Sequence, residues 1–231
     1  MKPSLAEVNS LRPHDKSDRR IPWHREGKLT LSRRHFLHAG AAAGLLGIAG
    51  RPAITAAASF APQIDPRLKA RALLALAAKR SSIRNADVIG IADFSRPSGD
   101  PRFYLLDVMS GRMTAHHVAH GRGSDPTHCG WLQNFSNEYE SLATSRGAYV
   151  TGDFYNGKYG YSLRLSGLDP TNSNALGRAI VVHSAWYAEP EIAREQGKLG
   201  RSEGCFAFGA ASHAEMLGRL GPGRLLYADK V

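Results

Sequence analysis

Apolar residues recur at helical spacing in the segment that follows residue 64. They stand three or four positions apart, which is the period of one face of a helix, at Leu68, Ala72, Leu73, Leu76 and Ala77. Asp65 can cap the first turn, and Pro66 suits the first helical position because its missing N–H would have no partner there. We therefore predict a helix from Asp65 to about Ser82.

The pattern then becomes that of short strands, with apolar runs separated by polar turns. Ser110-Gly111 and Asn156-Gly157 predict hairpin turns; Asn-Gly is the stronger signal because both residues tolerate positive φ. A long polar loop is expected over residues 120–145. The predicted strands are residues 88–92, 103–108, 113–118, 148–155, 161–165, 179–182 and 224–228.

Two more helical segments are expected in the second half of the chain. Residues 189–196 form a short helix or an ordered loop. Ser212 and Glu215 have the spacing of a capping box, which predicts a helix from Ser212 to Leu220. The sum is a mainly β domain with two or three peripheral helices.

The first 58 residues have the features of an export signal. They carry ten Lys/Arg against four Asp/Glu. Arg33-Arg34 precede the small, apolar run 36–49, which at 14 residues is too short to span a bilayer, and an Ala-rich exit follows. The segment resembles a twin-arginine signal, which implies passage through the twin-arginine export machinery to the periplasm or cell envelope. We expect residues 1–58 to be the signal peptide, 59–85 an N-terminal helix and linker, and 86–231 the domain that carries the chain's candidate chemistry.

The remaining residues carry twenty Lys/Arg and sixteen Asp/Glu. No basic run with interleaved aromatics remains, so nucleic acid is not expected as a partner. No later stretch has membrane-spanning length, so no stable membrane insertion is expected after cleavage. Cys129 and Cys205 are the two cysteines. They leave three readings open: one disulfide, two inert thiols or a reactive thiol.

One pair of segments carries candidate chemistry. Val181-Val182 lead into His183-Ser184, and 18 residues separate His183 from Ser202-Glu203-Gly204-Cys205. A thiol attacks as its thiolate, and a neighbouring imidazole can accept its proton. A Gly-containing turn can supply backbone N–H groups to an oxyanion. On the residues alone, a buried structural thiol and a core histidine remain the more common interpretation.

The ordered motifs resemble the YkuD-type L,D-transpeptidases, in their murein L,D-transpeptidase catalytic-domain branch. That family has a histidine, a similar spacer and then Ser/Thr-x-Gly-Cys. The resemblance covers about residues 86–229, and its further segments are residues 91–95, 118–121, 135–137, 157–160 and 162–165.

The resemblance implies a β-sandwich-like fold, with Cys205 and His183 at the mouth of a cleft. Cys205 would attack the carbonyl of the third residue of a peptidoglycan tetrapeptide stem and expel D-alanine. His183 would be the base, Ser184 would orient the imidazole, and N–H groups around Gly204 and Cys205 would bind the oxyanion. An amine or water would resolve the thioester. No metal or organic cofactor is expected.

The chain departs from the common family motif at two places. Glu203 stands where many members have His, and Phe206-Ala207 follow Cys205 where many have Arg. Arg201 is the candidate replacement for that positive charge. Ser202, Arg201, Tyr187 and His120 are the expected substrate-binding residues.

Other interpretations stay open from sequence. His116, His117, His120 and His128 suggest zinc at first sight, but adjacent residues of a strand face opposite ways and no carboxylate spacing matches. A cysteine peptidase of the envelope is one alternative, although papain-like and cell-wall endopeptidases place Cys before His. A non-catalytic cell-wall-binding module with a Cys129–Cys205 disulfide is the other.

Overall fold

The computed structural model describes residues 63–231. The predicted signal peptide, residues 1–58, and the first part of the predicted linker lie outside the described residues. Eight strands form one mixed sheet in the order β3-β2-β1-β8-β4-β5-β6-β7. The strands are β1 Val88–Asp93, β2 Phe103–Asp107, β3 Met113–His116, β4 Gly147–Gly157, β5 Gly160–Gly167, β6 Val181–Ser184, β7 Phe206–Phe208 and β8 Leu225–Asp229.

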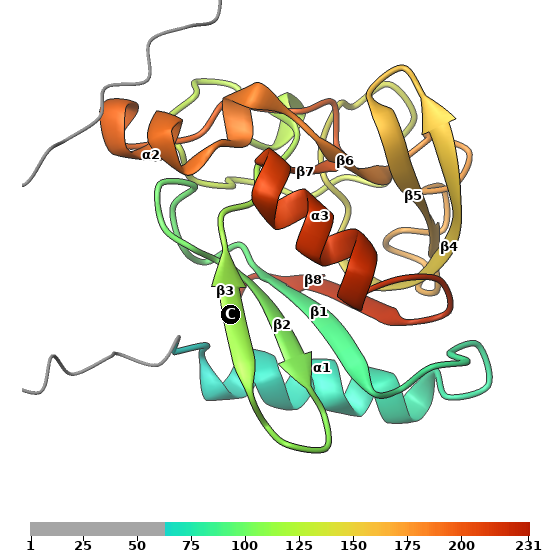
Figure 1. Ribbon diagram of the computed structural model, residues 1–231. Helices are drawn as coiled ribbons and strands as arrows, with labels where there is room; N and C mark the ends of the chain where they lie inside the picture. The colour runs from blue at the N-terminus through green and yellow to red at the C-terminus, as the bar shows by residue number, and fades with distance from the viewer. Residues whose placement is uncertain (1–62) are drawn as a thin grey trace, which may run out of the picture. The chain divides into compact units, whose positions relative to one another are not determined.

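Two neighbouring pairs in the sheet are parallel, β1 with β8 and β6 with β7. The other pairs are antiparallel. Phe208 on β7 packs edge-on against Phe103 on β2, with ring centroids 4.9 Å apart. Since these strands lie near opposite edges of the sheet, the sheet must curl to bring them into contact. Strands far apart in the sheet order thus share one core, which confirms the mainly β, sandwich-like prediction (Figure 1).

Helices α1 (Pro66–Ala78) and α3 (Ala210–Arg219) cover opposite faces of the sheet. Alternation along β1 explains this: Ile89 and Ile91 pack in the cluster with α1, whereas Ala92 faces the cluster that contains Met216 of α3. Figure 1 shows α1 beneath the strands and α3 in front of them. A third helix, α2 (Pro190–Gln196), follows a 3₁₀ turn, Trp186–Ala188.

Helix α1 agrees with its sequence pattern. Leu68, Ala72 and Leu76 are its buried residues, and the Asp65 side chain accepts a hydrogen bond from the Arg67 N–H. The helix ends at Ala78, four residues before the predicted end, because residues 79–82 form turns instead.

The turn of the β4–β5 hairpin is displaced from its predicted position. Asn156 pairs with Tyr161 and Gly157 with Gly160, so the two-residue turn is Lys158-Tyr159. Gly160 has the positive φ (80°) that this turn needs. The Asn-Gly prediction located the hairpin correctly and placed its turn two residues too early.

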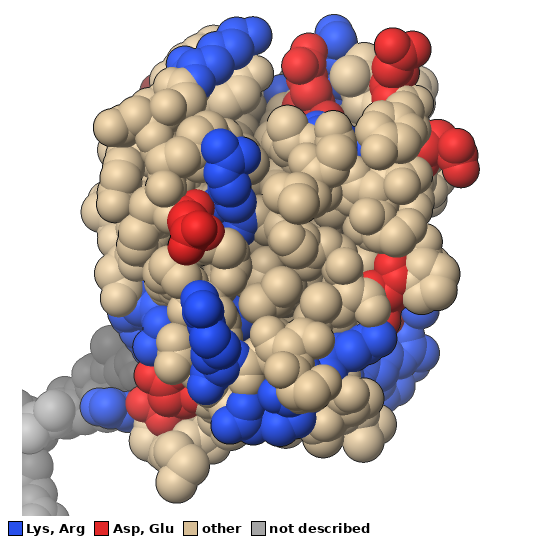
Figure 2. Space-filling model, turned by 90° about the vertical axis from the view of Figure 1, so that its right-hand side faces the viewer, with Lys and Arg blue, Asp and Glu red and all other residues tan. Residues whose placement is uncertain are grey.

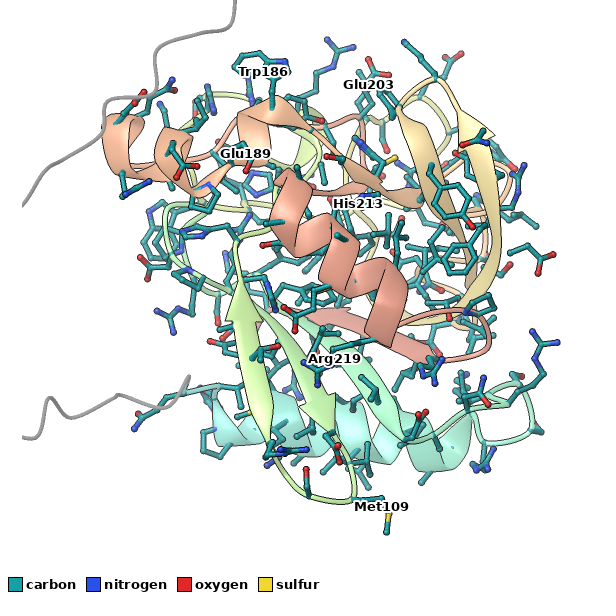
Figure 3. All side chains as sticks on the ribbon, in the orientation of Figure 1. Met109, Trp186, Glu189, Glu203, His213 and Arg219 are labelled. Atoms are coloured by element: carbon teal, nitrogen blue, oxygen red, sulfur yellow. The ribbon has the colours of Figure 1, made fainter. Side chains whose placement is uncertain are left out.

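The predicted capping box of α3 is wrong. The helix begins at Ala210, with Gly209 at the cap position. The Ala210 N–H is capped from another element, since it donates to the Glu189 carboxylate at 2.7 Å. Figure 3 shows Glu189 beside the first turn of α3. Ser212 lies inside the helix and contacts His116 at 3.2 Å.

Charge is distributed in both signs over the described surface. On the face in Figure 2, Lys and Arg lie among Asp and Glu, with basic side chains more frequent in the lower part of the view. None of the described helices is long and apolar enough to cross a membrane.

Candidate active site

Parallel strands β6 and β7 bring the predicted base and nucleophile together. His183 lies on β6 opposite Ala207 of β7, and Cys205 is the residue before β7 begins. Cys205 therefore lies two residues along the strand from the partner of His183. Both side chains line one cavity of about 490 Å³.

The His183 ring is fixed from two sides. Its Nδ1 lies 2.9 Å from the Ser184 carbonyl oxygen, so Nδ1 carries the proton and Nε2 is left to accept one. The Tyr159 ring stacks on the imidazole, with centroids 4.4 Å apart. Burial lowers the pKa of His183, and the hydrogen bond to Ser184 partly opposes this. A buried imidazole with a lowered pKa is neutral at pH 7, as a base must be.

The Cys205 thiol is protonated in this environment. Burial raises its pKa to about 11, although a backbone hydrogen bond from Val181 and the charge of Arg178 act in the other direction. Sγ lies 3.6 Å from the Ala179 carbonyl oxygen, to which it donates. The resting pair is thus a neutral thiol and a neutral imidazole.

The turn before Cys205 is built around the Ser202 hydroxyl. This group donates to the Cys205 carbonyl at 2.7 Å and accepts from the Gly204 N–H at 3.2 Å. Gly204 has φ of 113°, and a Cβ there would lie 2.8 Å from the Ala143 carbonyl oxygen. Only glycine fits this position without strain. Because the Gly204 N–H is already bonded to Ser202, it is not free to bind an oxyanion.

Three of the four predicted substrate-binding residues line the cavity, namely Ser202, Arg201 and Tyr187. The Arg201 guanidinium donates to the carbonyl oxygens of Asp125 and Pro126. Burial raises the pKa of Tyr187, so its phenol remains a neutral donor.

His120 does not line the cavity, contrary to the prediction. It is 1% exposed, and its Nδ1 lies 2.6 Å from Nη2 of the fully buried Arg102. Burial, and then the charge of Arg102, lower the pKa of His120 to about 3. Its contribution to the site is through the backbone, because the His120 carbonyl oxygen accepts from the Ser202 N–H at 2.9 Å.

Arg178 is a cavity residue that the sequence motifs did not indicate. It precedes strand β6 by three residues, in a segment without a recognisable motif. The sequence signal that could have indicated Arg178 is its position just before the apolar strand that ends in His183, the predicted base. Lys158 and Tyr159, at the tip of the β4–β5 hairpin, also line the cavity.

Cys129 and Cys205 are both free thiols. The disulfide of the alternative reading is therefore not formed in this structure. Within residues 63–231, no group of three His, Cys, Asp or Glu side chains is arranged to hold a metal ion. His117 and His128, two of the zinc candidates, instead bond to the backbone carbonyls of Gly99 and Leu199.

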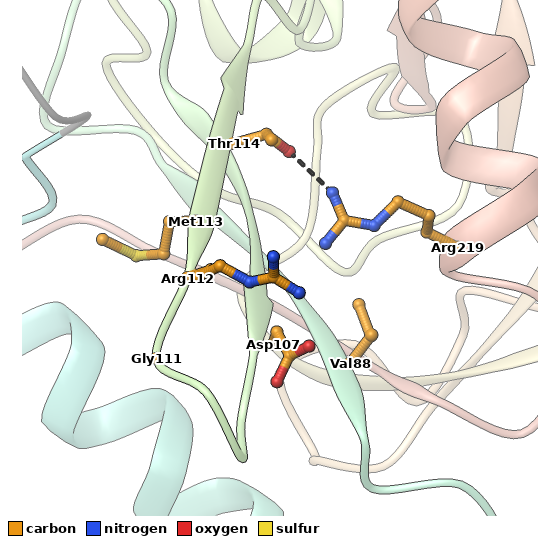
Figure 4. A pocket seen from close by; sticks show the side chains of 7 residues that line it. All are labelled: Val88, Asp107, Gly111, Arg112, Met113, Thr114 and Arg219. Atoms are coloured by element: carbon orange, nitrogen blue, oxygen red, sulfur yellow. Dashed lines mark hydrogen bonds between the residues drawn. The ribbon is translucent and has the colours of Figure 1, made fainter. Parts of the chain in front are cut away.

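A second cavity, of about 660 Å³, lies at the start of β1, where Val88 lines it, and beside Arg219 of α3 (Figure 4). It contains neither a cysteine nor a histidine. Its lining residues are Val88, Asp107, Gly111, Arg112, Met113, Thr114 and Arg219.

Solved structures similar to this chain include several L,D-transpeptidases. One from Mycobacterium smegmatis is 15% identical with a TM-score of 0.39, and the match covers 63% of this chain and 59% of that one. L,D-transpeptidase 3 from Mycobacterium tuberculosis, in complex with a faropenem-derived adduct, is 15% identical with a TM-score of 0.35, covering 62% and 60%.

The helical cell shape determining protein Pgp2 (K307A mutant) from Campylobacter jejuni is 13% identical with a TM-score of 0.40, covering 72% of this chain and 57% of that one. This chain therefore matches less than two thirds of the length of the M. smegmatis structure (59%) and of the C. jejuni structure (57%). A comparison with curated proteins found no match.

A family model for the L,D-transpeptidase catalytic domain matches residues 61–228. The match includes helix α1 and all eight strands, except for the last residue of β8, and it contains both His183 and Cys205. The chain therefore belongs to the L,D-transpeptidase catalytic domain family.

Proposed function

We propose that this protein is a cell-envelope enzyme that transfers acyl groups of peptidoglycan stem peptides through a thioester on Cys205. One observation carries the proposal: a thiol and a neutral, oriented imidazole line the same cavity from neighbouring parallel strands. The mixed-sheet fold and the family membership are consistent with this chemistry.

In the first half-reaction, Cys205 Sγ attacks the carbonyl carbon of the third stem residue. The thiol proton passes to Nε2 of His183 as the C–S bond forms, so a free thiolate is not needed beforehand. The tetrahedral intermediate then collapses and the C–N bond to D-alanine breaks. His183 returns the proton to the leaving amine, which gives free D-alanine and a neutral thioester.

In the second half-reaction, the amine of another stem attacks the thioester, and His183 accepts its proton. The new amide is the cross-link, and the thiol is regenerated. If water attacks instead, the product is a trimmed stem, which is carboxypeptidase-like activity. Neither route needs a cofactor.

Neighbouring groups have distinct tasks in this scheme. The Ser184 carbonyl holds the imidazole tautomer, and Ser202 with Gly204 shapes the turn that presents the thiol. Since the Gly204 N–H is bonded within the turn, the Cys205 N–H is the remaining backbone donor for the oxyanion. Arg201 and Tyr187, which line the cavity, would bind polar groups of the stem.

The N-terminal segment supplies the location in this proposal. Residues 1–58 direct the folded protein through the twin-arginine machinery to the periplasm, and cleavage near Ala58 releases it. Replacing Arg33 and Arg34 together by Lys is expected to retain the protein in the cytoplasm, as measured by cell fractionation. Normal periplasmic accumulation of that variant would contradict this step.

The test of the activity is release of D-alanine from tetrapeptide muropeptides by the purified protein. The Cys205→Ala variant is expected to release none while keeping its circular dichroism spectrum and Tm. Cys129→Ala is the matched control, because it removes the other thiol from an exposed loop, and it should retain activity. Equal activity of Cys205→Ala and the parent would refute the proposal.

A covalent probe gives a second test. Because a similar structure carries a faropenem-derived adduct, faropenem is expected to add its mass to this protein at Cys205. Mass spectrometry of the intact protein and of its peptides reads this out. The adduct should persist in Cys129→Ala and disappear in Cys205→Ala, and adduct formation on Cys129 alone would count against Cys205 as the nucleophile.

A further inference from the structure

The guanidinium of Arg178 lies in the wall of the catalytic cavity without an acidic partner among residues 63–231. Its Nη1 donates to the Ser136 carbonyl at 2.9 Å and to Ser145 Oγ at 2.7 Å. Its Nη2 donates to Ser141 Oγ at 3.1 Å and to the Ala143 carbonyl at 2.5 Å. All four hydrogen-bond partners are neutral, and the nearest groups that can carry negative charge outside the cavity, Glu138, Tyr139 and Tyr149, act on the guanidinium without forming an ion pair with it.

This charge lies against the turn that carries the nucleophile. A Cβ added at Gly204 would be 3.3 Å from Arg178 Nη2, so the guanidinium is in contact range of the residue before Cys205. The residue after Arg178, Ala179, accepts from Cys205 Sγ. Arg178 and Ala179 therefore approach the thiol from the same segment.

The other cationic side chains of the cavity are engaged differently. Lys158 lies over the ring of Tyr159, with Nζ 5.4 Å from the centroid. Arg201 donates to the Asp125 and Pro126 carbonyls, away from the Gly204 turn. The remaining titratable groups that line the cavity are Tyr155, Tyr159, His183, Tyr187 and Glu203.

Negative charge appears near the Gly204 turn twice in the proposed reaction. It develops on Sγ as the proton leaves, and on the carbonyl oxygen when the tetrahedral intermediate forms. A fixed cation in a partly water-excluded wall stabilises such charge without having to reorganise. Burial and Glu203 act against the thiolate, and Arg178 opposes them.

We propose that Arg178 supplies the fixed positive charge of this site, stabilising first the thiolate character that develops on Cys205 Sγ and then the oxyanion. Through its hydrogen bonds, the planar guanidinium also holds the loop over residues 136–145 against the Gly204 turn. The part concerning the oxyanion rests on the proposed acyl transfer. The part concerning the thiolate does not, because alkylation of the thiol requires no stem peptide.

The experiment measures the rate of Cys205 alkylation by iodoacetamide, a neutral reagent, from pH 6 to 11 in a Cys129→Ala background. Arg178→Gln removes the charge and keeps a hydrogen-bonding side chain. Its profile is expected to move to higher pH by about one unit, which is about a tenfold lower rate at pH 8. Arg178→Lys keeps the charge and should react within about threefold of the parent.

Arg194→Gln is the matched control, because it removes one positive charge from an exposed pair with Glu191 on α2. Its profile should superimpose on that of the parent. A purely structural role for Arg178 predicts instead that Lys is as damaging as Gln, since both lose the planar fork. The proposal is overturned if Lys shifts the profile as far as Gln, or if Gln shifts it no more than Arg194→Gln.

Two further readouts complete the test. If Arg178→Gln does not fold, judged by its Tm, the Lys variant decides alone: a profile within about 0.5 unit (about threefold in rate) of the parent supports the charge, and any larger shift refutes it. With tetrapeptide muropeptides, Gln should lower kcat while KM changes little. If the parent protein has no activity on stem peptides but the alkylation profiles are as expected, the acyl-transfer proposal is refuted. The role of Arg178 toward the thiol would still be supported.

Discussion

Single residues in the cavity favour proton transfer during attack over a preformed ion pair. Burial raises the pKa of Cys205 to about 11 and lowers that of His183. Sγ donates to the Ala179 carbonyl in the resting protein. A preformed thiolate–imidazolium pair would require a lowered pKa for Cys205 and a raised pKa for His183. The thiol therefore keeps its proton until His183 accepts it during the attack on the substrate.

This arrangement predicts the pH dependence of kcat/KM. His183 must be neutral to act as base, and its pKa lies below the ordinary value of 6.5. Activity should rise with pH through a midpoint below 6.5 and stay level through neutral pH, because the thiol does not ionise until about pH 11. Initial rates of D-alanine release at subsaturating substrate, from pH 4.5 to 9, measure this. A midpoint above 7 would show that His183 is not buried in this way.

The residues of the site differ in how far the sequence reveals them. His183, Ser202, Gly204 and Cys205 form a motif with fixed spacing, so they could be named without a structure. Arg178 could not, because its partners lie 33 to 42 residues earlier in the chain. The side-chain role of His120 was wrongly predicted because the sequence does not show that Arg102 is buried against it.

Elements were predictable where the signal is local. The apolar runs located seven of the eight described strands, because alternating or continuous apolar residues bury one or both faces of a sheet. The exception is β7, whose three residues, 206–208, are too few to give a strand pattern. Helix ends were less accurate, because caps can come from distant residues. Glu189 caps α3 from 21 positions earlier, and no spacing rule within the helix indicates it.

The observed cap of α3 gives a stability prediction. Glu189→Ala should lower the free energy of unfolding by about 1 kcal/mol, because the Ala210 N–H loses its acceptor. Urea denaturation followed by circular dichroism measures the change. Glu191→Ala is the matched control: its carboxylate pairs with Arg194 on the surface, and its effect should be within a few tenths of a kcal/mol. If Ser212 were the cap, Ser212→Ala would lower the free energy of unfolding more than Glu189→Ala. That result would contradict the structure.

On the scale of the whole molecule, one buried carboxylate joins helix α1 to the sheet. Asp229, at the end of β8, is fully buried and pairs with Arg71 of α1 and with Arg146 before β4. Tyr227 donates to the same carboxylate at 3.1 Å. The sequence could not predict this junction, because it depends on which strands are neighbours.

Removing both arginines should be strongly destabilising. Arg71→Ala with Arg146→Ala leaves the Asp229 carboxylate buried with a single donor side chain, and we expect a loss of about 3 kcal/mol in the free energy of unfolding. Each single variant should lose less than half of that, since the other arginine remains. Thermal and urea denaturation of the four proteins form a double-mutant cycle. Additive and small effects would show that the carboxylate is accessible to water.

The position of β8 in the sheet has a consequence for how the protein is made. Residues 225–229 lie between β1 and β4, although every other strand precedes them in the chain. Synthesis proceeds from the N-terminus, so a growing chain holds two separate half-sheets, β1–β3 and β4–β7, each with one bare edge where β8 belongs. Strand β8 can pair with both edges only after it has been synthesised. A prematurely terminated chain would lack β8, and both edges would remain free to pair with strands of other chains and aggregate.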